Sequence, residues 1–495
     1  MSLRKLSGET LIYGLSSILG RLLNFVLLTP FLTRVLSEGE FGEVGNLMFW
    51  TALLIALLVF RMDTAVFRFA SRGEYNPELV FQRAQRIVWL LVVVVIGPLM
   101  LLAPTVAELI ATPGSTVYVQ LVLVTVAFDA LSAVPLARLR LHQRPWFFVG
   151  VNLGNALFNI ALVYGLLAPL PAYLPAQFVP EFRVGYYLLS IAVAAALRYL
   201  VLLADGLRAR HPAPPPPTLD AALPAPAPGL GRLLRYSLPL TVVSVAGIAN
   251  ALVGPALLIG YDPAWAGYFT AALRMAVFLN LFVTAYQYAA EPFFFRQSGS
   301  DLATADRTIY ADALRAYALV ATLASVGILL GLPWLRLFIG ADVRPGLVVL
   351  PILLAANFLF GIYSNLSIAY KLTDQTFLGG VIALIGSVFA VGGPLLFTGR
   401  YGIYAPALGM LLCFLVMCVG VYLVSRRYFP VHYPFARILL YVVLGVGACL
   451  LGRLSEAMLY RTLLLALLLL ALLALERNWL RRTFMGGAAG AKKVS

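Results

Sequence analysis

The chain has 495 residues, of which 61% are hydrophobic and only 12% are charged. A soluble globular domain carries about 25% charged residues, so this composition excludes an ordinary soluble protein and indicates a polytopic membrane protein. The formal net charge of +15 would suit a nucleic-acid-binding protein, but the cations gather in the loops of one membrane side, which excludes that class.

Fourteen apolar segments follow one another, each long enough to cross a hydrocarbon core of about 30 Å as a helix. The strands of a membrane barrel would be about ten residues long and alternating, so we predict an all-α protein of about 14 transmembrane helices. The predicted spans are 10–33, 43–60, 87–111, 116–137, 146–168, 184–204, 236–260, 266–290, 309–331, 346–368, 376–397, 402–424, 437–452 and 459–475. The last span is nearly featureless leucine, and we expect it to face lipid.

The loops carry a strong charge bias. With the N-terminus assigned to the cytoplasm, 27 of the 36 lysines and arginines fall on the inner side. Seven fall on the outer side: Arg34, Arg183, Arg336, Arg344, Arg400, Arg453 and Arg461. By the positive-inside rule this bias places both termini in the cytoplasm. The excess charge is attracted to anionic headgroups, so membrane lipids are expected partners and nucleic acid is not.

A proline-rich stretch, HPAPPPPTLDAALPAPAPG at 211–229, follows the sixth span and cannot form a helix. We interpret it as an extended cytoplasmic spacer. The chain is therefore divided into an N-terminal six-helix lobe (1–205), a linker rich in proline and alanine (206–235), a C-terminal six-helix lobe (236–425), and two extra helices with a basic cytoplasmic tail (426–495).

The two groups of six spans carry matching motifs, which indicates a parallel pseudo-repeat. Pro30 is followed by Gly42 twelve residues later, and Pro255 is followed by Gly267 twelve residues later. Since six is an even number, both lobes have the same orientation, as a parallel repeat requires. The paired prolines are either the moving breaks of a transporter or ordinary tolerated kinks.

Two arginines lie deep inside predicted spans. Arg21 is about 17 Å from the inner end of span one, and Arg274 is about 12 Å from the outer end of span eight. Both are too deep to reach the headgroup layer easily, so they face protein, water or an anionic ligand. We predict that they bind substrate; an ion pair with an intramembrane acid is the alternative.

Asp129 is the candidate acid nearest to the middle of a span. It either pairs with Arg21 or titrates as a proton or sodium site during transport. Asp63, at the cytoplasmic end of span two, is a second candidate for ion coupling. It is flanked by Arg61 and Arg68, which either anchor the membrane boundary or make the first contact with an anionic lipid headgroup.

Amides accompany these charges. Asn152, Asn155 and Asn159 recur at spacings of three and four, and therefore lie on one helical face. Together with Asn24 and Asn250 they either hydrogen-bond sugar hydroxyls along a wet cavity or join helices to one another.

No catalytic or metal-binding pattern appears. The three cysteines fall inside spans and the three histidines in scattered loops, so no spacing suggests a metal site. No D-x-D or Walker sequence is present, and no outer loop is long enough for a catalytic domain. We therefore predict a protein that is not an enzyme and has no cofactor or metal.

This pattern resembles the polysaccharide transporter family of the multidrug/oligosaccharidyl-lipid/polysaccharide exporter (MOP) superfamily, which includes the O-antigen and exopolysaccharide repeat-unit flippases. The residues that carry the resemblance are EFGEVGNL (40–47), DTAVFRFAS (63–71) and AGYFTAALRM (266–275), and the fourteen-span plan extends it over nearly the whole chain. Lipid II flippases share this plan. In them, arginines of spans one and eight line a cationic cavity, and Arg21 and Arg274 are similar in position.

The resemblance implies a flippase of the bacterial cytoplasmic membrane. It would carry an isoprenoid-pyrophosphate-linked oligosaccharide by alternating access, for O-antigen, capsule or exopolysaccharide biosynthesis, with a polymerase or glycosyltransferase as partner. The alternatives are a lipid II flippase and an ion-coupled drug exporter of the same superfamily, which would need cavity acids rather than arginines. A membrane-embedded polysaccharide ligase or polymerase, or a lipid-binding scaffold, explains less of the pattern.

Overall fold

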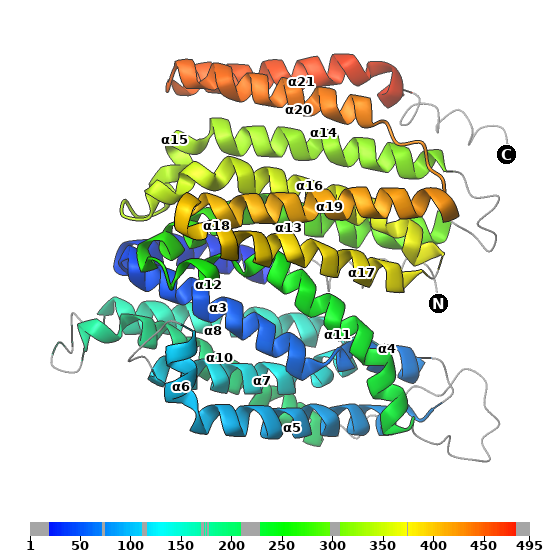
Figure 1. Cartoon of the computed structure of the whole chain (residues 1–495). Coiled ribbons are helices and arrows are strands. Elements are labelled where there is room, and N and C mark those ends of the chain that lie inside the picture. The colour runs from blue at the N-terminus through cyan, green and yellow to red at the C-terminus, as the bar shows by residue number, and fades with distance from the viewer. Residues whose placement is uncertain are drawn as a thin grey trace.

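The computed structural model describes residues 19–71, 75–110, 116–169, 173, 175, 178–208, 228–297, 307–373 and 375–481. Over these residues the chain is helical and contains no strand (Figure 1). Thirteen helical segments in the described part are long and apolar enough to cross a membrane, and they correspond to the second to fourteenth predicted spans. The first predicted span is described from Leu19 and continues as a helix to Val35. The predicted all-α multi-pass architecture is therefore confirmed.

The N-terminal lobe is built around α7 and α10, which pack against each other, with α3, α5 and α8 beside them. Its elements are η1 (Asn24–Leu28), α2 (Thr29–Val35), α3 (Glu38–Val59), α4 (Met62–Ser71), α5 (Pro77–Leu101), α6 (Ala103–Leu109), α7 (Thr116–Leu141), α8 (Pro145–Leu167), η3 (Pro180–Phe182) and α10 (Arg183–Arg208).

The C-terminal lobe is built around α16, which packs against α13, α14 and α19. Its elements are α11 (Leu230–Leu252), α12 (Gly254–Leu258), α13 (Pro263–Gln297), α14 (Thr308–Leu330), α15 (Leu332–Leu335), η4 (Arg336–Phe338), η5 (Arg344–Val349), α16 (Leu350–Leu372), α17 (Thr376–Ser387), η6 (Val388–Gly392), α18 (Gly393–Tyr401) and α19 (Tyr404–Tyr428). The final elements, α20 (Phe435–Leu451), η7 (Gly452–Leu454) and α21 (Met458–Leu480), lie on the far side of this lobe, against α14 (Figure 1).

Capping residues start some helices before their apolar windows begin. The side chains of Ser37 and Glu40 form a reciprocal capping box, so α3 begins at Glu38, five residues before the predicted span. The Asn76 side chain accepts a hydrogen bond from the backbone N–H of Glu78, which starts α5 ten residues early. Polar helical turns of this kind are invisible to hydropathy.

The predicted linker is helical at both margins. α10 continues to Arg208 and α11 begins at Leu230, while residues 209–227 lie outside the described part of the chain. The Arg83 guanidinium on α5 donates a hydrogen bond to the carbonyl of Pro228, at 2.7 Å. We call the end of the bundle that carries Arg83, Arg208 and Pro228 the linker end.

Pro30 and Pro255 mark matching breaks. The π-helical turn η1 precedes α2, which has Pro30 in its first turn, and α11 stops before α12, which has Pro255 in its first turn. Proline removes a backbone donor and its ring crowds the preceding turn, so a break at that position is expected.

The lobes meet through a reciprocal contact between α3 and α13. A Cβ on Gly42 would overlap the carbonyl oxygen of Pro263, and a Cβ on Gly267 would overlap that of Glu38. Pro263 and Gly267 follow Glu38 and Gly42 by the same 225 residues, so each lobe presents the same surface to the other. This arrangement is a pseudo-two-fold interface, and it supports the predicted repeat. We call this close contact of Gly42 and Gly267 the glycine seal.

Further contacts close the same end of the bundle, which we call the sealed end. The backbone N–H of Gly340 donates to the Thr33 hydroxyl at 2.9 Å. The Arg34 guanidinium donates to the carbonyl of Leu337 at 2.7 Å. Both bonds join α2 to the C-terminal lobe. At this end the lobes are therefore in contact through α2 as well as through α3 and α13.

The last two helices carry a buried charge that the sequence pattern concealed. α21 exposes half of its twelve leucines, as expected for a helix with one face toward lipid, but Glu476 is fully buried. Its carboxylate pairs with Arg315 of α14 and accepts a hydrogen bond from the Tyr441 hydroxyl of α20 at 2.7 Å. A buried carboxylate needs such partners, so this cluster fixes α20 and α21 to the lobe.

Candidate functional site: a polar cavity between the lobes

A cavity of about 230 Å³ lies between the lobes, on the linker side of the glycine seal. The N-terminal lobe supplies most of its wall, and α13 closes it from the C-terminal lobe. Its lining residues are Asn24, Leu28, Met48, Asp129, Asn155, Asn159, Tyr187, Ile191, Ala194, Ala195 and Arg274. Five of these are predicted site residues: Asn24, Asn155, Asn159, Asp129 and Arg274.

Arg274 brings a positive charge into this cavity from the C-terminal lobe. It lies seven residues beyond Gly267 on α13, about 10 Å from the glycine seal at 1.5 Å per residue. Its guanidinium sits over the Phe41 ring of α3, 5.0 Å from the ring centroid. It forms no ion pair with any described residue, so its charge is held by an aromatic face and available to an anion.

Three amides line the opposite wall. The carbonyl oxygens of Asn24, Asn155 and Asn159 are buried and have no hydrogen-bond partner within the described part of the chain. A buried acceptor without a partner costs free energy unless a water or ligand donor occupies the cavity. These oxygens are therefore suited to hydroxyl or N–H donors of a bound molecule.

Asp129 pairs with an arginine other than the one predicted. Its carboxylate lies 2.6 Å from the Arg198 guanidinium of α10, so the predicted pairing with Arg21 is wrong. Arg198 is one of the 27 cations that the charge count places on the inner side, yet α10 continues for ten residues beyond it. The pair is neutral overall, which leaves Arg274 as the net charge of the lining.

Arg21 is not among the lining residues of the cavity. It lies one helical turn before Asn24, on the linker side, and its side chain is exposed. Gly20 beside it approaches Ala156 of α8, so this turn packs close to the helix that carries Asn155. An arginine in this position can contact an anion on its way to Asn24 and Arg274.

Two predicted amides point elsewhere. The Asn152 side chain donates to the Phe148 carbonyl on its own helix at 2.9 Å. The buried Asn250 side chain donates to the Ala383 carbonyl of α17 at 3.3 Å, inside the C-terminal lobe. Asn250 therefore agrees with the packing alternative, because it joins two helices. Asn152 agrees with neither alternative, because its bond stays within α8 and it does not line the cavity.

The predicted cluster of Arg61, Asp63 and Arg68 lies at the linker end, away from the cavity. Arg61 occupies the turn between α3 and α4 with a φ of 52°. Arg68 stacks on the Tyr236 ring of α11, 4.5 Å from its centroid. That contact joins the two lobes, so Arg68 is occupied by an aromatic face at the linker end.

The whole arrangement matches solved membrane transporters. The structure of the lipid II flippase MurJ in an inward closed conformation superposes with a TM-score of 0.74 at 14% sequence identity, covering 95% of this chain and 100% of MurJ. An inward-facing multidrug resistance MATE family transporter of the MOP superfamily gives a TM-score of 0.57 at 16% identity, covering 89% and 96%. An outward-facing one gives 0.55 at 17% identity, covering 88% and 95%. The chain shares the fold of these transporters.

No protein-family model matches the chain, and no curated protein matches it at a significant level. The likeness therefore concerns the fold, and it agrees with the fold that the sequence resemblance implies.

Within this MOP fold, α10 contributes cavity residues that the sequence reading missed. Tyr187, Ile191, Ala194 and Ala195 follow one face of α10 at helical spacing. The sequence feature that could have indicated this role is a helical face with one tyrosine followed by alanines. The small alanine side chains leave room beside the amides of α8. Apolar and small residues carry no charge signal, so only the packing reveals their role.

Proposed function

We propose that this protein is a flippase that carries an isoprenoid-pyrophosphate-linked oligosaccharide across the bacterial cytoplasmic membrane by alternating access, for the biosynthesis of a surface polysaccharide. The observation that carries this proposal is the interlobe cavity, in which the Arg274 guanidinium faces three unpartnered amide oxygens. A cation and a set of acceptors in one wet cavity match the two polar parts of such a substrate.

The cation suits the pyrophosphate. An anion of this kind cannot enter hydrocarbon without a partner, and a guanidinium binds phosphate oxygens through a planar fork. Arg274 supplies this fork inside the cavity, and Arg21, one helical turn before Asn24, would supply a second one outside it. Two separate arginines would receive the anion first at the linker end and then between the lobes.

The amides suit the sugars. A sugar hydroxyl donates a hydrogen bond to a carbonyl oxygen, and Asn24, Asn155 and Asn159 offer three such oxygens on one side of the cavity. In the closed state the cavity of about 230 Å³ holds only a small part of an oligosaccharide. The proposal therefore requires that the lobes separate at the linker end when substrate enters.

The isoprenoid chain would remain beside the helices. A second, largely apolar cavity of about 720 Å³ lies between α14, α16 and α20, with Val326, Leu354, Phe358 and Val446 among its lining residues. It offers hydrocarbon-like surface on the C-terminal lobe, so a tail would not need to cross the polar cavity.

The state and orientation follow from the charge bias. With the linker end in the cytoplasm, the glycine seal closes the extracytoplasmic side. Substrate would then enter from the cytoplasmic leaflet, and opening of the seal would release it. A polymerase or glycosyltransferase that uses the translocated lipid would be the functional partner.

A lipid II flippase is the second candidate, because the superposition on a lipid II flippase has the highest TM-score of those given above, 0.74. Lipid II has the same polar chemistry, a pyrophosphate followed by sugars. An ion-coupled drug exporter is less well supported, because Asp129, the acid of the cavity, is already paired with Arg198.

Complementation separates these candidates. The wild-type chain is expressed in two strains, one lacking its O-antigen repeat-unit flippase and one depleted of its lipid II flippase. Restored surface polysaccharide in the first strain alone supports the proposed substrate, whereas growth of the second strain alone supports lipid II. Arg274→Ala should abolish the rescue, and Arg208→Ala, at the exposed end of α10, should retain it. Rescue of neither strain by a membrane-inserted wild-type chain would contradict the proposal.

A further inference from the structure

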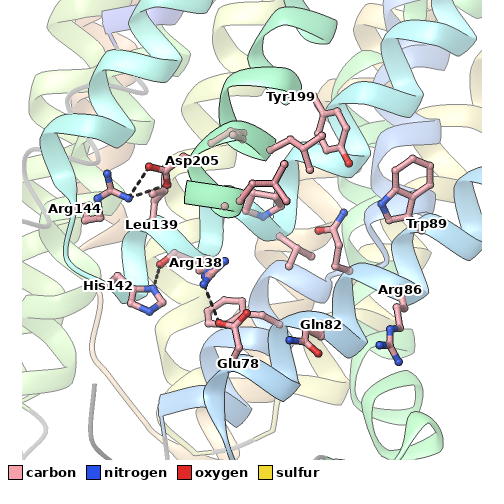
Figure 2. A pocket seen from close by; sticks show the side chains of 18 residues that line it. Glu78, Gln82, Arg86, Trp89, Arg138, Leu139, His142, Arg144, Tyr199 and Asp205 are labelled. Atoms are coloured by element: carbon pink, nitrogen blue, oxygen red, sulfur yellow. Dashed lines mark hydrogen bonds and ion pairs between the residues drawn. The ribbon is translucent and has the colours of Figure 1, made fainter. Parts of the chain in front are cut away.

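A separate pocket of about 330 Å³ lies at the linker end of the N-terminal lobe (Figure 2). It is formed by the first half of α5 and the last turns of α7 and α10, and none of its lining residues lines the interlobe cavity. Nothing in the proposed transport cycle uses it. Its lining is polar toward the linker end and aromatic toward the middle of the bundle, which is unusual for a packing defect.

Two of the three arginines that line this pocket are in ion pairs, and the third is not. Arg138 pairs with Glu78 at 2.9 Å, and Arg144 pairs with Asp205 at 2.8 Å. Arg86 also lines the pocket, and its side chain is exposed without an ion pair to any described residue. Figure 2 shows both pairs as dashed lines, with Arg86 apart from them on α5. The five side chains therefore carry a net charge of +1, the complement of one phosphodiester.

The other side of the pocket faces the membrane. Trp89 and Tyr199 line it, and Trp89 is 44% exposed. Beyond Trp89, α5 exposes Leu90, Val93 and Val94, and α10 exposes an apolar strip as well. Amphipathic aromatic rings concentrate at the boundary between headgroups and hydrocarbon. The pocket thus has its charge at headgroup level and its mouth toward acyl chains.

One buried acceptor in the pocket has no partner. The Gln85 side chain donates to the Leu131 carbonyl at 3.3 Å, while its own carbonyl oxygen is buried and unpaired. A donor on a bound molecule would satisfy it. A phosphate that carries a glycerol headgroup offers both partners. Its hydroxyl can donate to the Gln85 carbonyl oxygen, and its anionic oxygens can accept from Arg86.

We propose that this pocket binds one anionic phospholipid of the leaflet at the linker end, with its phosphodiester on Arg86 and its headgroup hydroxyl on Gln85. The acyl chains follow the exposed apolar faces of α5 and α10. The volume of about 330 Å³ suits a lipid headgroup. The pocket lies within one lobe and shares no residue with the interlobe cavity, so we do not assign it to transport. The bound lipid bridges α5 to α10 across the open side of the lobe.

The experiment measures lipid retention by the purified full-length protein with native mass spectrometry, after addition of phosphatidylglycerol or phosphatidylcholine. We expect one phosphatidylglycerol to be retained preferentially by the wild type. Arg86→Gln should reduce that retention about fivefold, the effect of one cation near a lipid phosphate. Arg208→Gln removes the same charge at the same end but outside the pocket, and should leave retention unchanged.

Three further measurements make the outcome decisive. Equal losses in Arg86→Gln and Arg208→Gln would overturn the proposal, because the effect would then be general surface charge. A thermal shift by inorganic phosphate that equals the shift by phosphatidylglycerol would also overturn it, in favour of a plain anion site. If Arg86→Gln does not fold, Gln85→Leu tests the same site through the hydroxyl, and unchanged retention in that variant contradicts it. Arg274→Ala should lose transport but still retain the lipid. A failure of the proposed transport function is therefore distinguishable from a failure of lipid binding.

Discussion

In the C-terminal lobe the amide of Asn280 donates to the Asn357 side chain at 3.1 Å, and Asn357 in turn donates to the Leu353 carbonyl at 2.9 Å. In the N-terminal lobe, the carbonyl oxygens of Asn155 and Asn159 are buried toward the cavity without a partner. The same residue type, in helices of the same repeat, is therefore used in two ways. One set joins helices, and the other leaves acceptors for a bound molecule.

This difference shows how to separate structural from functional polar residues inside a membrane. A satisfied amide stabilises the fold, because breaking its bonds leaves a buried group unpaired. An unsatisfied amide beside a cavity lowers stability until something fills the cavity, so its retention needs another explanation. On this criterion the N-terminal lobe holds the recognition surface, and the C-terminal lobe contributes mainly Arg274.

The largest expected effect is that of Arg274. Arg274→Ala removes the charge of the C-terminal wall, and we expect translocation of a lipid-linked oligosaccharide in proteoliposomes to fall roughly a hundredfold, the value of a strong charge-assisted contact. Arg274→Lys should keep part of the rate if charge alone matters. Full activity of the alanine variant would contradict the role of this wall.

The next effect concerns the ion pair inside the N-terminal lobe. Asp129→Asn leaves Arg198 without its counter-charge, and we expect the free energy of unfolding to fall by about 2 kcal/mol, read as a lower Tm in detergent. The double variant Asp129→Asn with Arg198→Gln should recover most of this loss. If Asp129→Asn instead keeps its Tm and stops transport, the carboxylate has the ion-coupling role that the sequence suggested.

A matched pair of amide variants tests the comparison directly. Asn159→Ala in the cavity should lower transport about tenfold with little change in Tm, because it removes an acceptor that only the substrate uses. Asn280→Ala should lower Tm by a few degrees with a smaller effect on transport, because it breaks a helix-joining bond. If the loss of transport rate relative to the loss of Tm is the same in both variants, the amides of the two lobes do not differ in role.

The smallest effect is expected at Arg21. Because this side chain is exposed and does not line the cavity, Arg21→Ala should lower the transport rate only a few-fold, and the difference should shrink as salt screens the approach of the substrate. Initial rates at low and high ionic strength measure this. A loss as large as that of Arg274→Ala would place Arg21 in the binding site itself.

The sequence predicted the fold well because hydrophobic length and charge bias are strong local signals. It also predicted a substrate-facing Arg274, since a charge at that depth needs protein, water or a ligand, and it left Asn155 and Asn159 open between a wet cavity and helix packing. It did not reveal the partner of Asp129, because Arg198 was counted as a topological charge. Asn250 shows the same limit, since its contact with the Ala383 carbonyl comes from helices 133 residues apart. Tertiary packing decides which helices are neighbours, and the periodicity of a single sequence does not reveal it.

The glycine seal has a consequence for the kinetics of opening. Because Gly42 rests on the backbone of Pro263 while Gly267 rests on that of Glu38, a rigid-body separation of α3 from α13 moves both glycines off their contacts together. Separation therefore loses both contacts in one step, with no half-open arrangement that retains one of them. Two symmetric contacts of this kind favour two long-lived states of the interface, sealed and open. Both contacts come from the motif that the two lobes share.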